Sequence, residues 1–368
     1  MRYRFLVCGI AFGISAGLAQ AQAQGLGSEF RGTNEPGEIP RGVLSIDLTP
    51  GETMRGLPSF DTADLEDFAE GARTRQTLTA DELAELFGTV SRNRNGETTE
   101  DPAGDLFFAA PLPEAEAFDR HSAEGAAEAL ALIDDLTPRS MTPNNARRVS
   151  DGTIWPYRAV GLIAALDQFE NIIGSCSAAL IGPRTVLSAA HCFYDHETGW
   201  IDDMLFVPGV TDLDNFGPPF GAFGWEEMHI ASAYISEYDG TVLSTVPYDI
   251  AIVHLDTDIG NHLGWLQVQM VDQTIPGYLS NLVGYPGDMP FGTMWWMGCP
   301  VNFMNQPPKF TFRQCVTAGG TSGGPMYDHQ PASDSRFILN INVAGNDEVS
   351  IGLTIDEEHF RWLSALWK

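Results

Sequence analysis

Basic residues are scarce in this sequence. Its 368 residues contain 20 lysines and arginines against 49 aspartates and glutamates, which gives a formal net charge of −29 at pH 7. A surface that neutralises a phosphate backbone needs clustered positive charge, so we expect no nucleic-acid partner. Long hydrophobic runs are also missing beyond the N-terminal segment, and this excludes a multi-span membrane protein.

Cysteine is rare as well. Of the five cysteines, Cys8 lies in the N-terminal apolar run, and four remain: Cys176, Cys192, Cys299 and Cys315. An even number in an exported protein predicts two disulfides, with three pairings open. Zinc is the alternative, but neither pair has C-x-x-C spacing.

The first 23 residues have the features of a secretory signal peptide. Arg2 and Arg4 precede an apolar run from Phe5 to Leu18, and small residues at A-x-A spacing follow. The run is too short for a membrane anchor. We therefore expect secretion, to the periplasm or the medium, and no membrane span.

Residues 24–139 differ in composition from the rest. All eight tryptophans and the four remaining cysteines lie after residue 139. Helix-like spacing occurs over 61–87, where Thr79 and Glu82 form a predicted capping box, and again over 113–134. The segment is interpreted as a pro-segment removed on activation, with a flexible secretion spacer as the alternative.

Residues 140–368 show the pattern of an all-β domain. Short apolar runs are bounded by Gly, Pro, Asn or Asp, and they predict strands over 159–166, 177–191, 249–256, 279–287 and 336–345. Residues 356–367 carry acids in their first turn and an apolar face, which predicts a terminal helix. Many strands with one closing helix indicate a sandwich or barrel.

Three residues of this domain suggest nucleophilic catalysis. His191 ends an apolar run, Asp249 opens a strand, and Ser322 lies in the turn GGTSGGP. A serine hydroxyl needs a base to take its proton and a carboxylate to orient that base. Singly, each residue has an ordinary structural explanation, but together they have the order His, Asp, Ser. Backbone amides of Gly320 and Ser322 are the predicted oxyanion hole.

The stretch 320–324 also fits the G-x-S-x-G motif of α/β-hydrolases. That fold needs the order Ser, acid, His, for which Asp328 or Asp334 with His359 are available. It also needs alternating strands and helices before the serine, and the upstream sequence lacks such helices. We therefore favour the first arrangement.

The chain resembles the trypsin/chymotrypsin-like serine proteases in the blocks AAHC, DIAIV and GGTSGGP. The stretches WPYRAVGLI, SCSAALIGPRTVLSAAHCFYD and VGYPGD resemble the bacterial glutamyl-endopeptidase branch more narrowly. The resemblance implies two antiparallel six-stranded barrels, about 150–262 and 263–355, before a C-terminal helix over 356–367. It also implies that His191 is the general base, Asp249 its orienting carboxylate and Ser322 the nucleophile.

The resemblance also assigns residues for specificity and activation. Thr317 matches a Thr or Ser position of the branch's pocket, and Gly345 lies where the backbone pairs with substrate. Asn342 stands where the branch has a histidine that helps neutralise a bound glutamate, which argues against strict glutamate preference. Thr321 replaces the usual aspartate of trypsin-like members. Processing is expected near Arg139 and Ser140.

The sequence thus predicts a secreted serine endopeptidase made as a zymogen. We expect protein or peptide substrates, the pro-segment as a candidate inhibitor, and no cofactor. The remaining histidines lack a paired-ligand spacing, so we expect no metal site. The alternatives are a catalytically silent homologue that binds proteins, and an esterase using the same triad.

Overall fold

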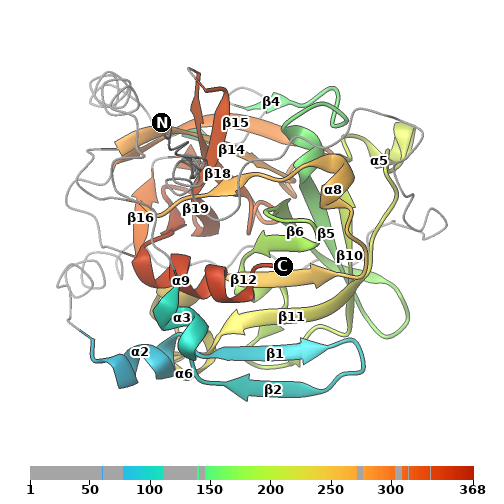
Figure 1. The fold of residues 1–368 in the computed structure, drawn as a ribbon. Helices are drawn as coiled ribbons and strands as arrows, with labels where there is room; N and C mark the ends of the chain where they lie inside the picture. Colours follow the sequence, from blue (N-terminus) through green and yellow to red (C-terminus); the bar gives the residue numbers. More distant parts are fainter. Residues whose placement is uncertain are drawn as a thin grey trace, which may run out of the picture.

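Strands are the main regular elements of the protein in a computed structural model (Figure 1). The structure describes residues 60, 78–110, 139–140, 146–271, 277–302, 309–313, 315–331 and 333–368. Within these residues the strands form two eight-stranded sheets and two small two-stranded ones. The all-β fold expected from the sequence is confirmed, and each large sheet contains a run of six neighbouring antiparallel strands.

The first sheet contains the predicted base and its carboxylate near the ends of paired strands. Its central strands are almost wholly buried, as expected for continuous apolar runs. In order across the sheet the strands are β10 (Asp203–Pro208), β5 (Val160–Leu166), β6 (Ile172–Leu180), β7 (Thr185–Ser188), β12 (Ala251–Leu255), β11 (Trp225–Ala231), β1 (Thr89–Asn93) and β2 (Thr98–Asp101).

The second sheet carries the predicted nucleophile in a loop. Across it lie β16 (Phe310–Arg313), β20 (Ser350–Thr354), β19 (Ser335–Gly345), β18 (Pro325–Gln330), β14 (Gly277–Gly284), β15 (Trp295–Asn302) and β4 (Arg147–Arg148), with β13 (Gln267–Val268) beside β19. The small sheets are β17 (Cys315–Val316) with β3 (Arg139–Ser140), and β8 (Tyr194–Asp195) with β9 (Gly199–Trp200).

Helices are short, apart from one at the end of the chain. They are α2 (Ala80–Leu86), α3 (Asp105–Ala109), α5 (Leu213–Phe216), α6 (Ser232–Ser236), α7 (Val242–Thr245), α8 (Gly260–Leu263) and α9 (Glu357–Leu366), with 3-10 turns η3 (Tyr157–Ala159), η4 (Ala190–Cys192) and η5 (Val246–Tyr248). The expected C-terminal helix is therefore confirmed, and Asp356 caps it by accepting from the His359 amide. Among the described residues no helix has the length and apolar character needed to cross a membrane.

The predicted strands agree with the structure except at one position. The run 177–191 is not one strand but parts of two, because Gly182 and Pro183 form the turn between β6 and β7. The run then ends in η4, which contains His191. Strands β11, β18 and β20 were not predicted because polar residues or glycine interrupt their apolar residues. Strands β10 and β15 are largely apolar but were not assigned from the sequence.

Residues 78–110 pack against the first sheet. Strand β1 pairs with β11, and the β1–β2 hairpin continues the sheet below β11 in Figure 1. Phe87 and Phe107 from this segment are buried in the main core. The predicted capping box of Thr79 and Glu82 is present. This part of the predicted pro-segment (residues 24–139, called the leader below) thus forms an edge of the sheet. The helix expected over 113–134 lies outside the described residues.

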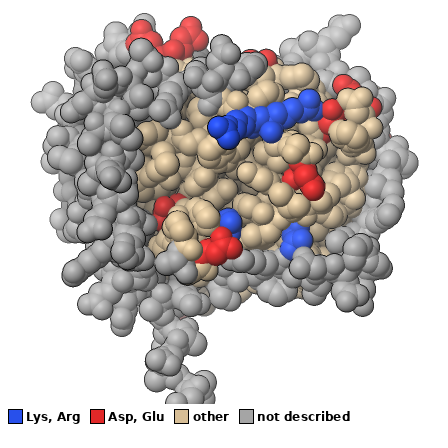
Figure 2. All heavy atoms as spheres, turned by 90° about the horizontal axis from the view of Figure 1, so that it is seen from above, with Lys and Arg blue, Asp and Glu red and all other residues tan. Residues whose placement is uncertain are grey.

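Charge is unevenly spread on the surface. On the face seen from above in Figure 2, most of the described surface is neither acidic nor basic, and the blue basic groups do not merge into one broad patch. The few basic groups pair with acids in several places, for example Arg148 with Asp212 at 2.7 Å.

Candidate active site

The His191 and Asp249 side chains meet at the ends of two paired strands. Strand β7 ends three residues before His191, β12 begins two residues after Asp249, and the register pairs Ser188 with Ala251. The His191 ring nitrogen Nδ1 lies 2.6 Å from Asp249 Oδ2, and the His191 amide donates to Oδ1 at 2.9 Å. This double contact orients the imidazole, because the ring cannot rotate without losing a short bond.

The second ring nitrogen of His191, Nε2, is available to accept a proton. Asp249 is buried, so its carboxylate acts on the ring with little screening by water. With the Nδ1 proton held by the carboxylate, Nε2 carries a lone pair, and no hydrogen-bond partner for Nε2 is present among the described residues. An imidazole in this state can accept a proton from a neighbouring hydroxyl.

Ser322 lies in the loop between β17 and β18. The loop comes from the second sheet, yet Ser322, His191 and Asp249 line one cavity of about 410 Å³. Ser322 is almost fully buried. The structure therefore brings the three predicted residues into one cavity. In the sequence even the nearest two, His191 and Asp249, are 58 positions apart.

Ser177 on β6 holds this loop across the two sheets. Its hydroxyl donates to the Gly320 carbonyl at 2.8 Å and accepts from the Tyr285 amide at 2.9 Å. Its amide donates to the Ser322 carbonyl at 2.7 Å. Sequence reasoning missed Ser177, because a serine beside a half-cystine looks like any polar residue of a strand.

Glycines around Ser322 are required by the backbone and by close contacts. Gly320 has φ of 88° and Gly323 has φ of 73°, a region that side chains disfavour. A Cβ atom on Gly320 would lie 2.3 Å from the Tyr285 carbonyl oxygen. Within the described part of the chain, no backbone carbonyl accepts from the Gly320 or Ser322 amides. Two unused amides beside a buried serine can stabilise an oxyanion.

The predicted specificity residues form a separate, buried polar network. Thr317 Oγ1 lies 3.3 Å from Asn342 Oδ1 and 3.0 Å from the Ser350 hydroxyl. Asn342 Nδ2 donates to Thr321 Oγ1 at 3.2 Å, next to Ser322. Gly345 ends β19 opposite Ser350. None of Thr317, Asn342 and Gly345 lines the 410 Å³ cavity, so the structure does not bring them together there with the three residues of the proposed triad.

Aromatic side chains form one wall of the cavity. The His196 ring stacks on Tyr238 at 3.7 Å between centroids, and Tyr234 and Tyr194 lie beside it. Burial lowers the pKa of His196, although Asp195 and Asp249 oppose this shift. A flat apolar wall of this kind can pack against a side chain of a bound peptide. The sequence did not predict this wall, because its members come from two segments, 194–196 and 234–238, that are far apart in the chain.

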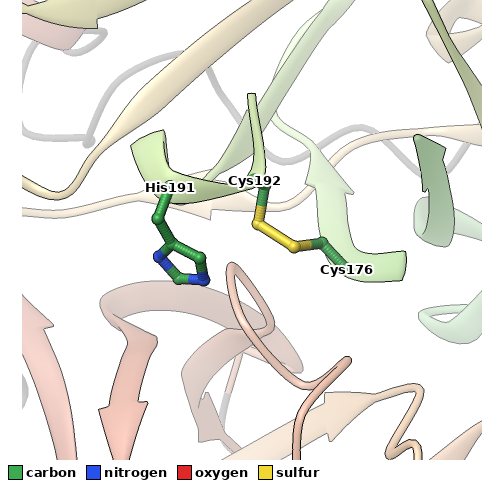
Figure 3. A group of neighbouring side chains, drawn as sticks. All are labelled: Cys176, His191 and Cys192. Carbon is green, nitrogen blue, oxygen red and sulfur yellow. A yellow bond between two sulfur atoms is a disulfide. The ribbon is translucent and has the colours of Figure 1, made fainter. Parts of the chain in front are cut away.

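The structure contains the two predicted disulfides. They are Cys176–Cys192 and Cys299–Cys315, with sulfur atoms 2.03 and 2.09 Å apart. In Figure 3 the first disulfide runs from the His191 segment to a neighbouring strand, while the imidazole extends toward the ribbon below it. Cys176, His191 and Cys192 are grouped like metal ligands. Both sulfurs are bonded to each other, however, so no thiolate is available to a metal.

The residues needed for the α/β-hydrolase alternative are engaged elsewhere. His359 Nδ1 lies 2.6 Å from Asp356, and its Nε2 lies 2.8 Å from the Pro247 carbonyl. Asp334 pairs with His329. None of Asp328, Asp334 and His359 lines the cavity with Ser322.

Comparisons with known proteins agree with this geometry. The trypsin family profile matches residues 162–281. An extracellular metalloprotease of Bacillus subtilis (strain 168) is 26% identical over 230 residues, which cover 62% of this chain and 70% of that protein. A glutamyl endopeptidase of Bacillus licheniformis is 30% identical over 227 residues, which cover 60% of this chain and 66% of that protein. The chain thus spans about two thirds of each relative.

A solved structure of a Glu endopeptidase has the same fold. It matches with a TM-score of 0.50 at 22% identity and covers 60% of this chain and 94% of that chain. The matched part corresponds in size to the two sheets without the leader.

Proposed function

The chain belongs to the trypsin-like serine proteases and is a serine endopeptidase similar to glutamyl endopeptidases, and we propose that His191, Asp249 and Ser322 are its catalytic triad. The observation that carries the proposal is the His191 imidazole. Asp249 holds its Nδ1 at 2.6 Å, its Nε2 has no partner among the described residues, and Ser322 lines the same cavity.

In the proposed reaction Ser322 Oγ attacks the carbonyl carbon of the scissile bond while His191 Nε2 takes its proton. The amides of Gly320 and Ser322 stabilise the oxyanion, and the imidazolium returns the proton to the leaving amine. Water, activated by the same imidazole, then hydrolyses the acyl-enzyme. Asp249 remains ionised throughout and stabilises the imidazolium.

A fluorophosphonate probe tests this assignment. We expect the active protein to gain one label by intact mass, Ser322→Ala to gain none, and Ser175→Ala to keep the label. Ser175 is the matched control because it also lines the cavity. Labelling that persists in Ser322→Ala would refute the assignment. Absence of labelling in all three proteins would favour the silent, protein-binding alternative, and turnover of esters without peptides would favour the esterase.

For specificity we propose a pocket built around Thr317, Asn342 and Gly345 that does not demand glutamate. The hydrogen bonds there join the hydroxyls of Thr317, Ser350 and Thr321 to the Asn342 amide, and Asn342 stands where the resembled branch has a histidine. A carboxylate bound without a cation is poorly compensated. Cleavage of a peptide library is expected to show neutral and acidic residues before the scissile bond, and strict glutamate selection would contradict this.

We further propose that the enzyme is secreted as a zymogen and processed near Arg139 and Ser140. Strand β3 pairs in parallel with β17, and the register sets Ser140 opposite Val316, one residue before Thr317. A new N-terminus at Ser140 would therefore begin beside the proposed specificity pocket. The test is N-terminal sequencing of the mature protein in the culture medium and in the periplasm; a start far beyond Val149 would contradict it.

A further inference from the structure

A cluster of three ligand-type side chains lies outside the catalytic cavity, on strands β11 and β12. Glu227 and His229 are two positions apart on β11 and so share one face of the sheet. The antiparallel register places His254 of β12 directly opposite Glu227. Sequence spacing did not reveal this group, since 25 residues separate the two histidines and only the strand pairing joins them.

The three ligand atoms form a small triangle. His229 Nε2 lies 3.0 Å from His254 Nδ1, His254 Nδ1 lies 3.4 Å from Glu227 Oε2, and His229 Nε2 lies 3.7 Å from the same oxygen. Ligands at the usual zinc distances stand about 3.3 Å apart in a tetrahedral site. The edges of the triangle scatter around that value, so one cation can reach all three atoms.

The other nitrogen of each ring has its own partner. His229 Nδ1 lies 2.8 Å from the Ser91 hydroxyl, and His254 Nε2 lies 2.8 Å from the Leu366 carbonyl. Metal-binding histidines usually hold their second nitrogen in this way, which orients the ring and sets the tautomer. Because a carbonyl only accepts, His254 Nε2 must carry the proton. Its Nδ1 in the neutral ring then presents a lone pair toward the Glu227 carboxylate.

The two rings are buried, and the carboxylate lies at the surface. His254 is fully buried and His229 nearly so, whereas the Glu227 side chain is 40% exposed. The charged neighbour is Lys368, whose Nζ lies 3.0 Å from Glu227 Oε2. This ammonium sits on a half-exposed side chain and can move aside for a cation.

We propose that Glu227, His229 and His254 bind a divalent cation of the zinc class, with water as the fourth ligand. None of the three lines the catalytic cavity, so the site is separate from the triad. Its outer partners Ser91 and Leu366 belong to the leader strand β1 and to the last turn of α9. A bound cation would therefore hold the β1–β2 hairpin and the C-terminus against strands β11 and β12.

Zinc and cobalt binding to the full secreted chain test the site. The chain should carry Ser322→Ala against self-cleavage and His191→Ala against metal bound at the catalytic imidazole. We expect one Zn²⁺ per chain in equilibrium dialysis after EDTA treatment, and a Co²⁺ complex whose intense visible absorption indicates four-coordination. Glu227→Gln and His254→Gln should each weaken zinc binding by at least 100-fold, and Ser91→Ala by about tenfold.

Two controls keep the result interpretable if a histidine variant misfolds. Glu227→Gln changes a half-exposed group and should retain the fold by circular dichroism. His262→Gln and Glu226→Gln, which alter residues of the same types outside the cluster, should bind zinc as before. Zinc should raise the melting temperature of the parent but not of Glu227→Gln. Absence of stoichiometric binding in the parent, or unchanged binding in Glu227→Gln and His254→Gln, would overturn the proposal and leave a hydrogen-bonded histidine pair.

Discussion

The base and the nucleophile of the proposed triad are held in place by different means. His191 and Asp249 come from one sheet and lie at the ends of strands that pair directly. Ser322 comes from the other sheet, and a few polar bonds from Ser177 hold its loop. A position within a sheet follows from strand register, whereas a position between sheets depends on individual contacts. We therefore expect the position of Ser322 to be more sensitive to single substitutions than the positions of His191 and Asp249.

The largest effect is expected where orientation of the base is lost. Asp249→Asn removes the charge that fixes the His191 tautomer, and kcat should fall about 10⁴-fold while the fold is retained. Steady-state kinetics on a peptide substrate and circular dichroism measure the two properties. Asp256→Asn, a partly exposed acid at the far end of β12, is the matched control. Less than a tenfold loss in Asp249→Asn would remove Asp249 from the triad.

The terminal helix provides a second test, because it supports the Asp249 segment from outside the sheet. His359 bonds to the carbonyl of Pro247, two residues before Asp249, and Asp356 holds both His359 and Lys309. Asp356→Asn should lower the free energy of unfolding by about 3 kcal/mol, since it leaves buried charges unpaired. Urea denaturation measures this, and Glu357→Gln on the same helix should change it by less than about 0.5 kcal/mol.

The same variant predicts a pH dependence. Burial would raise the pKa of Asp356, but the charges of His359 and Lys309 and their hydrogen bonds hold it well below the usual range. A carboxyl with a lowered pKa stabilises the fold above its unfolded pKa, and this contribution disappears as pH falls below about 4. The difference between the parent and Asp356→Asn should thus be constant near neutrality and shrink in acid. A difference that grows in acid would contradict the assigned charges.

The next largest effect on stability and activity is expected from the hydrogen bonds between the two sheets. Ser177→Ala leaves the Gly320 carbonyl and the Tyr285 amide without their buried partner, at a cost of about 2 kcal/mol in unfolding free energy. Activity should fall as well, because the loop carrying the oxyanion-hole amides is displaced. Thermal unfolding and kcat/KM measure both, with Ser175→Ala on the same strand as control. Equal behaviour of the two variants would show that the loop holds itself in place.

The smallest expected effect concerns specificity. Asn342→His introduces a ring that can carry positive charge beside Thr317 and Thr321. We expect kcat/KM for glutamate relative to glutamine before the scissile bond to rise about tenfold, which corresponds to about 1.4 kcal/mol. Paired peptide substrates measure the ratio. No change, together with an intact fold, would place the specificity pocket elsewhere.

The sequence predicted individual elements where local chemistry decides them. The Thr79 capping box and the terminal helix with acids in its first turn were predicted from residues close in sequence, and both are present. The β1–β2 hairpin was not predicted, because TVSRN is mostly polar and partly buried and TTED is polar and exposed. Only pairing with β11 makes β1 a strand, and such a partner is not visible in a local window.

The sequence by itself determined the all-β class, the residue types of the triad and their order along the chain. These follow from hydrophobic periodicity and from short motifs, which are local properties. Tertiary structure decided the disulfide pairing, the role of Ser177, the Thr317–Asn342 network and the meeting of Glu227, His229 and His254. Each of these needs residues from separate segments to come within hydrogen-bond distance, and only strand register and the packing of the two sheets bring them together.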